Sequence, residues 1–165
     1  MIFVTVGTQL PFPRMISAVL SWAHERRRRD LYLQHAGYRG DLLGLPNSDF
    51  LDAAASARYM QEASIVVAHA GMGTILACLE RSTPCIIVPR NGALGEHRND
   101  HQLATARKFE GRSGIFVAWS ETEIAAFLDR ASELTGGAGI DPYASAELIA
   151  ALRDFVWNGH PPRGV

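Results

Sequence analysis

The sequence predicts an α/β fold with a doubly wound, mostly parallel sheet. Short apolar segments alternate with segments of helical spacing from the N-terminus to about residue 134. Apolar runs such as residues 65–68 and 84–88 have no polar residue at alternate positions. Strands without a polar face are buried on both sides, as in parallel sheets that helices cover. The length of 165 residues suits one domain with one core.

Five strands are predicted, each from a short run of mostly β-branched, aliphatic or aromatic residues. They comprise residues 2–6, 31–35, 65–68, 84–88 and 115–118. The segment 36–48 is rich in glycine, and its pattern does not decide between loop and strand.

Helical spacing of apolar residues predicts six helices, at residues 14–25, 53–63, 74–81, 99–109, 121–134 and 143–157. Asn99 is the expected N-cap of the fourth. Ser120 is the expected N-cap of the fifth, with Glu123 at the capping-box position. Residues 1–158 are expected to form one domain, and 159–165 a frayed tail.

Composition excludes several classes of protein. A hydrophobic content of 47% with 20% charged residues is that of an ordinary globular chain, and a net charge of −1 gives no reason to expect a nucleic-acid partner. Cys78 and Cys85 lie in apolar runs and are expected in the core, without a disulfide framework, which favours a reducing cytoplasm. No apolar run approaches the ~18 residues of a membrane span. Membrane association is therefore expected to be peripheral or through a partner.

Three loops should meet at one edge of the sheet. Gly7, His69 and Pro89 each follow the end of a predicted strand. Ligands of open α/β sheets bind outside the carboxyl ends of the strands. These loops are therefore the expected place of a binding site.

A glycine turn, Gly71-Met72-Gly73-Thr74, joins a strand to a helix. Unpaired N–H groups and the helix dipole favour an anion there. A plain strand-to-helix turn without a ligand is the alternative. The turn lacks the Lys-Ser/Thr pair of a P-loop, and Leu76 replaces the third glycine of a dinucleotide motif. Gly7-Thr8-Gln9 is a second such turn, which could add donors to the same phosphates or be a plain turn.

A polar run from Glu96 to Gln102 opens a later helix. Asp100 and Gln102 offer acceptors and donors to sugar hydroxyls. A solvated helix start is the alternative. His97 and His101 are four residues apart, but Arg98 stands where a zinc-binding helix motif has Glu. No metal is therefore expected.

Two further features remain open. Residues 26–29 are four arginines, which suit either a solvated helix end or weak contact with anionic lipid. The apolar face of the last helix either packs on its own sheet or docks a partner.

Three segments carry a resemblance to a known family: residues 3–8, 67–75, and 88–90 with 95–102. They resemble the UDP-binding C-terminal half of GT-B glycosyltransferases, the glycosyltransferase family 28 C-terminal domain. The chain is more similar still to small subunits of two-component transferases. These include the cytosolic subunit of the eukaryotic UDP-GlcNAc transferase of N-glycan assembly and the small subunit of bacterial exopolysaccharide glucuronosyltransferases. The implied fold is Rossmann-like.

The resemblance implies two groups of site residues. UDP and its phosphates would be held by Gly7, Thr8, His69, Gly71, Met72, Gly73 and Thr74. The donor sugar would be contacted by Arg90, Glu96, His97, Arg98, Asn99, Asp100, His101 and Gln102. Many relatives hold the ribose with a Glu one turn after the glycine turn. Ala77 stands there, and Glu80 is the candidate substitute. Charge matching favours Arg90 or Arg98 as the partner of a glucuronate carboxylate.

The implied function is the donor-binding subunit of an inverting, metal-independent glycosyltransferase that needs no cofactor. A membrane-anchored partner subunit would supply the acceptor site and the catalytic base at the cytoplasmic membrane face, with a lipid-linked saccharide as acceptor. The donor is expected to be UDP-glucuronate, or UDP-GlcNAc as an alternative. Self-association is a further expectation for the isolated chain. A regulatory UDP-sugar-binding module and a nicotinamide- or phosphate-binding enzyme are the rival functions.

Overall fold

A computed structural model of the protein describes residues 1–141 and 143–159. Its sheet has six parallel strands in the order β3-β2-β1-β4-β5-β6. They are β1 (Ile2–Thr5), β2 (Leu31–Gln34), β3 (Asn47–Ser48), β4 (Ile65–His69), β5 (Cys85–Val88) and β6 (Ile115–Val117). This is the strand order of a doubly wound Rossmann-like sheet, so the predicted fold class is confirmed.

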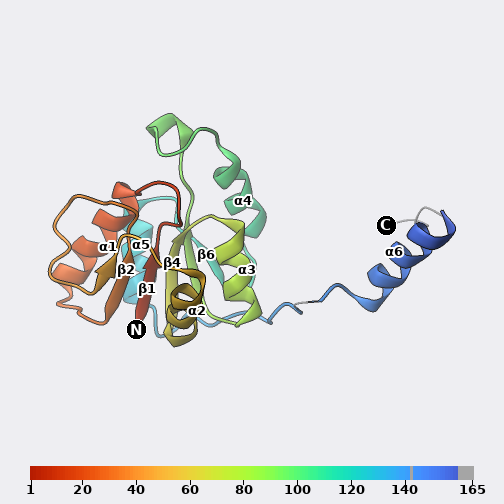
Figure 1. The fold of residues 1–165 in the computed structure, drawn as a ribbon. Coiled ribbons are helices and arrows are strands. Elements are labelled where there is room, and N and C mark those ends of the chain that lie inside the picture. Colours follow the sequence, from red (N-terminus) through yellow and green to blue (C-terminus); the bar gives the residue numbers. More distant parts are fainter. Residues whose placement is uncertain (142, 160–165) are drawn as a thin grey trace.

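Helices cover both faces of the sheet (Figure 1). They are α1 (Pro13–Glu25), α2 (Ala53–Glu62), α3 (Met72–Glu80), α4 (His101–Phe109), α5 (Glu121–Asp129) and α6 (Ala146–Asn158), with a short 3-10 turn η1 (Gly92–Leu94). Helices α1 and α5 pack on one face, and α2, α3 and α4 on the other. The strands are apolar on both sides because each side meets a helix layer.

Strand alternation divides the core into two layers. In β1, Ile2 and Val4 point to the α1/α5 layer, while Phe3 points to the other. The same alternation separates Val67 from Val66 in β4. Burial of these side chains fixes the register, since a slip by one residue would exchange the two faces.

Several predicted boundaries differ from the structure. The two-residue strand β3 lies in the segment left undecided. Helix α3 begins two residues earlier than predicted, and α5 ends at Asp129 rather than near residue 134. Asn99 is not the N-cap of α4: Asp100 holds that position, and the Asn99 side chain instead contacts the His101 ring.

Other local predictions are confirmed. The capping box of Ser120 and Glu123 is present at the start of α5. Cys78 and Cys85 are buried free thiols. Two arginines of the basic run are paired, Arg26 with Asp129 at 2.9 Å and Arg28 with Asp30 at 2.8 Å, which suits a solvated helix end.

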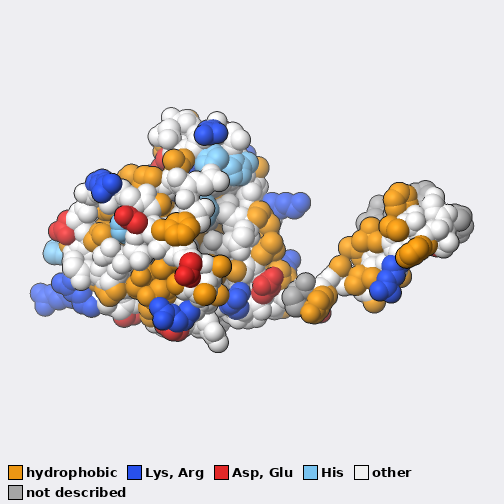
Figure 2. Space-filling view, in the orientation of Figure 1, with side chains coloured by type: hydrophobic (Ala, Val, Ile, Leu, Met, Phe, Trp, Pro, Cys, Tyr) orange, Lys and Arg blue, Asp and Glu red, His pale blue; other side chains and the backbone are white. Residues whose placement is uncertain are grey.

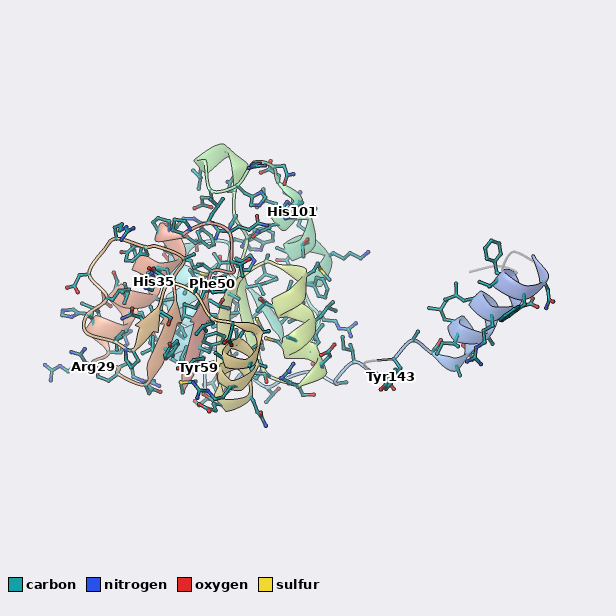
Figure 3. All side chains as sticks on the ribbon, viewed as in Figure 1. Arg29, His35, Phe50, Tyr59, His101 and Tyr143 are labelled. Carbon is teal, nitrogen blue, oxygen red and sulfur yellow. The ribbon has the colours of Figure 1, made fainter. Side chains whose placement is uncertain are left out.

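Helix α6 stands apart from the sheet in Figures 1 and 2. None of its residues is buried, and Trp157 is 80% exposed. Tyr143, on the segment that leads to α6, is also exposed (Figure 3). In this structure, packing of the last helix on its own sheet is therefore not seen. The predicted tail lies outside the described residues except for Gly159.

Within the described residues, every helix is too short or too polar to cross a membrane.

Candidate functional site

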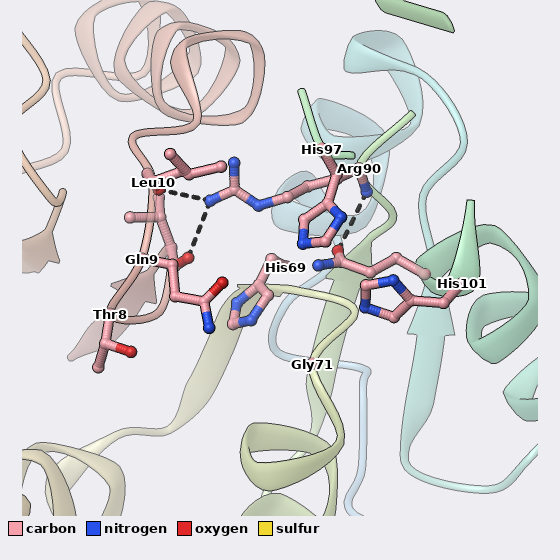
Figure 4. A pocket seen from close by; sticks show the side chains of 10 residues that line it. Thr8, Gln9, Leu10, His69, Gly71, Arg90, His97 and His101 are labelled. Carbon is pink, nitrogen blue, oxygen red and sulfur yellow. Dashed lines mark hydrogen bonds between the residues drawn. The ribbon is translucent and has the colours of Figure 1, made fainter. Parts of the chain in front are cut away.

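The loops after β1, β4 and β5 enclose a pocket at the carboxyl edge of the sheet (Figure 4). Strand order reverses between β1 and β4, which is where such sheets bind ligands. The cavity of ≈ 170 Å³ is lined by Val6, Thr8, Gln9, Leu10, His69, Gly71, Arg90, His97, His101 and Gln102. Its volume is below the roughly 300–1,000 Å³ of complete ligand pockets. It therefore suits one part of a larger ligand.

The imidazole ring of His69 lies between Gly7 and Gly71. A Cβ on Gly7 would lie 2.6 Å from His69 Cε1, and a Cβ on Gly71 would collide with the same ring at Nε2. Gly7 also has φ +79°, in the region that favours glycine. The two turns are thus brought together by one imidazole at the base of the pocket.

Burial, together with the smaller effect of the nearby Arg90 charge, lowers the pKa of His69 to about 4. The ring is therefore neutral at pH 7. Its Nδ1 is buried and has no hydrogen-bond partner within the described residues.

The first turn of α3 presents backbone donors at the pocket edge. Gly71 is the N-cap, and since it has no side chain, no cap occupies the first-turn amides. Met72 and Gly73 are exposed and Thr74 is half-buried. A Cβ on Gly73 would meet nothing within 4 Å. This glycine is thus not explained by packing.

The buried guanidinium of Arg90 is bound to backbone carbonyls. Its Nη2 donates to Leu10 O at 2.6 Å and Val6 O at 3.0 Å (Figure 4). Its Nη1 donates to Pro11 O at 2.8 Å and Glu96 O at 3.3 Å. With 2% of the residue exposed, a fork-like grip on a sugar carboxylate is not available. Arg90 therefore holds the loop after β1, and does not make the contact with the donor sugar that was expected from the sequence.

Several side chains of the polar run, residues 96–102, form hydrogen bonds within the protein. Glu96 accepts from Arg14 Nε at 2.7 Å and from the Asn91 amide at 2.9 Å. Asp100 accepts from the Gly92 amide at 2.8 Å. Gln102 is buried, and its Oε1 accepts from the Arg90 amide at 3.2 Å. These contacts shape the segment between β5 and α4.

His97 and His101 meet at the pocket rim, with ring centroids 4.6 Å apart in a T-shaped arrangement. Figure 2 shows histidine side chains gathered beside α4. His97 precedes the helix and does not share its face, contrary to the spacing argument. Within the described residues, no group of three His, Cys, Asp or Glu side chains is arranged to hold a metal.

The structure thus brings together only part of the predicted site. The pocket is lined by Thr8, His69, Gly71, Arg90, His97, His101 and Gln102. Outside its lining are Gly7, Met72, Gly73, Thr74, Glu96, Arg98, Asn99 and Asp100. Glu80 is the last residue of α3, two turns from the glycine turn and beside Arg81 at 3.8 Å. The helix places it away from the pocket, so it is not a group that could hold a ribose there.

The sequence did not predict Val6 and Leu10 as residues of the site. They flank the turn Gly7-Thr8-Gln9 in the loop after β1. Their position after the strand was the available signal, but their side-chain types gave none.

The profile of the glycosyltransferase family 28 C-terminal domain matches residues 1–124. The chain belongs to this family, and it is a glycosyltransferase domain. A search of curated proteins found no match.

Solved structures show the same fold. The NMR solution structure of ALG13 is 20% identical with a TM-score of 0.57, and the match covers 92% of this chain and 93% of that one. The kitacinnamycin glycotransferase is 18% identical with a TM-score of 0.58, over 79% of this chain and 34% of that one. The glycosyltransferase SsfS6 of Streptomyces sp. SF2575, solved with thymidine diphosphate, is 20% identical with a TM-score of 0.51, over 81% and 35%. The chain thus corresponds to about a third of these two larger enzymes.

Proposed function

We propose that this chain is the donor-binding subunit of a two-component, inverting glycosyltransferase that uses a UDP-sugar. The observation that carries the proposal is the pocket where the loop after β1 and the start of α3 meet around His69. The family membership supports glycosyl transfer, and a related structure holds a nucleoside diphosphate.

The pyrophosphate is assigned to the backbone amides of residues 72–74 and of Thr8. The amides of the neighbouring glycines are already used, because Gly71 N–H donates to His69 O at 2.7 Å and Gly7 N–H donates to Thr5 Oγ1 at 3.3 Å. Helix-start amides bind anions because their N–H groups are unpaired and the helix dipole is positive there. Thr74 can add a hydroxyl donor. Glu80 is left out of this site because it lies at the far end of α3.

The same groups would act in catalysis. When the sugar leaves UDP, negative charge grows on the β-phosphate. Donors already aimed at that charge stabilise the transition state more than the ground state. The step forms the new glycosidic bond to the acceptor oxygen, breaks the bond to the phosphate oxygen and releases UDP. It requires no metal or other cofactor in this proposal.

The donor sugar is assigned to the side of the pocket formed by His97, His101 and Gln102. The imidazoles and the amide can hydrogen-bond to sugar hydroxyls. A glucuronate carboxylate would accept hydrogen bonds from the N–H groups of these imidazoles. UDP-glucuronate is therefore the first donor to test and UDP-GlcNAc the second.

The acceptor site and the base are assigned to a membrane-anchored partner. Within the described residues, no carboxylate lines the pocket. The exposed apolar side of α6, which includes Leu152 and Phe155, is the proposed docking element. The partner would hold this chain at the cytoplasmic membrane face, next to a lipid-linked saccharide acceptor. Without it, α6 could mediate self-association.

The test is calorimetric titration of the purified chain with UDP, compared for the wild type and Thr74→Ala. We expect binding by the wild type and a loss of roughly 1–3 kcal/mol in the variant, as for a lost hydrogen bond to a charged group. Absence of UDP binding by the wild type contradicts the proposed function. Equal binding by both proteins contradicts the role of Thr74 alone.

A non-catalytic UDP-sugar module is the second candidate, favoured by the lack of a carboxylate base among the described pocket residues. Co-expression with a candidate membrane subunit, followed by a donor screen on membranes, separates the two. Sugar transfer that depends on both chains supports the enzyme, whereas binding without turnover in any combination supports the module.

A further inference from the structure

Most backbone carbonyls of the loop from Val6 to Pro11 accept hydrogen bonds from two buried side chains. The guanidinium of Arg90 donates to the carbonyls of Val6, Leu10 and Pro11. Gln34 Nε2 donates to the carbonyl of Gly7 at 3.0 Å. Four carbonyl oxygens of the loop are thus occupied by two side chains.

Three backbone donors of the same loop are left unpaired, whereas the Val6 amide donates to Gln34 O at 3.2 Å and the Gly7 amide donates to Thr5 Oγ1 at 3.3 Å. In residues 1–141 and 143–159, no atom accepts a hydrogen bond from the N–H groups of Thr8, Gln9 or Leu10. These three residues line the pocket. The loop therefore has three free amide donors among the residues that line the pocket, and such donors are what an anion requires.

The two side chains that hold the loop are themselves fixed. Gln34 is 4% exposed, accepts from Thr5 Oγ1 at 2.7 Å and donates to Asp49 O at 2.9 Å. Arg90 lies 4.5 Å from the centre of the Phe12 ring, and its own amide is bound by Gln102. Buried groups with several partners lose little further freedom when a ligand binds, so the loop is preorganised.

We propose that Arg90 and Gln34 are positioning residues that turn the carbonyls of the loop after β1 inward, so that its amides face the diphosphate. Neither side chain touches the ligand in this arrangement. The buried guanidinium also places a positive charge beneath the anion. This inference rests on the proposed function and assigns to that site the groups that shape it.

Arg90→Lys is the sharpest variant, since lysine keeps the charge but cannot reach several carbonyls with one planar fork. Gln34→Met removes the second contact without adding a charge. The exposed Arg107 on α4 gives the matched control Arg107→Met. Each variant is made in the full chain, and melting temperature and circular dichroism establish that it is folded.

The measurement is the ratio of UDP affinity to uridine affinity, by calorimetry for UDP and NMR titration for the weaker nucleoside. We expect Arg90→Lys to lower the ratio about tenfold or more, equivalent to about 1.4 kcal/mol. We expect Gln34→Met to lower it severalfold, and Arg107→Met to leave it unchanged. A variant that merely loosens the fold would weaken both ligands and leave the ratio as it was.

The possible outcomes distinguish failure of the proposed function from failure of the positioning role. If the wild type does not bind UDP, the proposed function fails. If it binds but the ratio is unchanged in both Arg90→Lys and Gln34→Met, the positioning role is overturned. A ratio preserved in Arg90→Lys but lost in Arg90→Met would assign the effect to charge alone and would also overturn it. If Arg90→Lys does not fold, Gln34→Met decides.

Discussion

The imidazole of His69 occupies the space that a side chain on Gly71 would need. Gly71 has φ −91° and ψ 131°, an extended conformation that any residue adopts. Its backbone therefore does not require glycine, but the ring beside it does. The glycine turn and the histidine that ends β4 form one packed unit.

Gly71→Ala should lower the free energy of unfolding by about 1–3 kcal/mol, because a methyl group would be forced into the ring. In a His69→Ala background the same substitution should cost much less. Urea denaturation of the wild type, both single variants and the double variant measures this coupling. Strictly additive losses would show that the ring is not what excludes the methyl group.

Gly73→Ala should weaken UDP binding without lowering the free energy of unfolding. A Cβ at this position meets nothing within 4 Å, and alanine is the better helix former by up to about 1 kcal/mol. We expect unfolding free energy to be unchanged or higher, and UDP affinity to fall because the methyl group obstructs close approach of the phosphates. Thermal denaturation and calorimetry on the same samples test this.

An unchanged UDP affinity in Gly73→Ala would place the phosphates away from the second glycine of the turn. Leu76, one turn later on α3 and exposed, provides a control. Leu76→Ala should affect neither stability nor affinity strongly.

The fold could be predicted from sequence because local pattern and burial agree. Apolar strands such as β4 and helices with one apolar face allow few arrangements other than a covered parallel sheet. The strand β3 was not predicted because two residues, Asn47 and Ser48, carry no periodicity. Its pairing with Leu33 and Gln34 depends on the tertiary structure.

The site was predicted less completely for a different physical reason. Backbone turns at Gly7 and Gly71 are encoded locally, so their meeting could be expected from strand order. The partners of Arg90 and Glu96 are distant in sequence, at Leu10 and Arg14. Residue type alone shows that a charge is present, but does not show whether protein or ligand neutralises it.

Stability should fall as pH decreases from about 6.5 to about 4 because of His69. Its pKa is about 4 in the folded protein against 6.5 in the unfolded chain. The unfolded state therefore binds the proton more strongly in this range, and stability is fully present only above pH 6.5. The loss is at most roughly 3.4 kcal/mol, at 1.36 kcal/mol per pKa unit.

Urea denaturation at several pH values checks this, with His69→Asn as the comparison. The variant should lose less stability than the wild type between the two pH limits. Parallel pH profiles for the two proteins would show that His69 is not the titrating group.

Glu96→Gln should destabilise the protein rather than simply weaken donor binding. Its carboxylate binds Arg14 and the Asn91 amide, and the two charged side chains are 17% and 10% exposed. Removing the charge leaves Arg14 with a weaker partner, at a cost of about 2–3 kcal/mol, below that of a fully buried pair. Chemical denaturation measures the loss.

Glu133→Gln is the matched control, because Glu133 and Arg130 form an exposed pair that should contribute little. A Glu96→Gln protein with wild-type stability and weakened UDP-sugar binding would restore the donor-contact role expected from the sequence.

Deletion of α6, in a chain that ends at Ala144, should leave the stability of the remaining domain within about 0.5 kcal/mol of the wild type. None of the residues of α6 is buried, so its removal exposes no core. Leu128→Ala in α5, where the side chain is 1% exposed, should by contrast cost about 2–5 kcal/mol. The shortened chain should also fail to co-purify with the proposed membrane subunit. A loss of stability comparable to that of Leu128→Ala would instead mean that the apolar face of α6 covers its own sheet in solution, and the docking role would then fail.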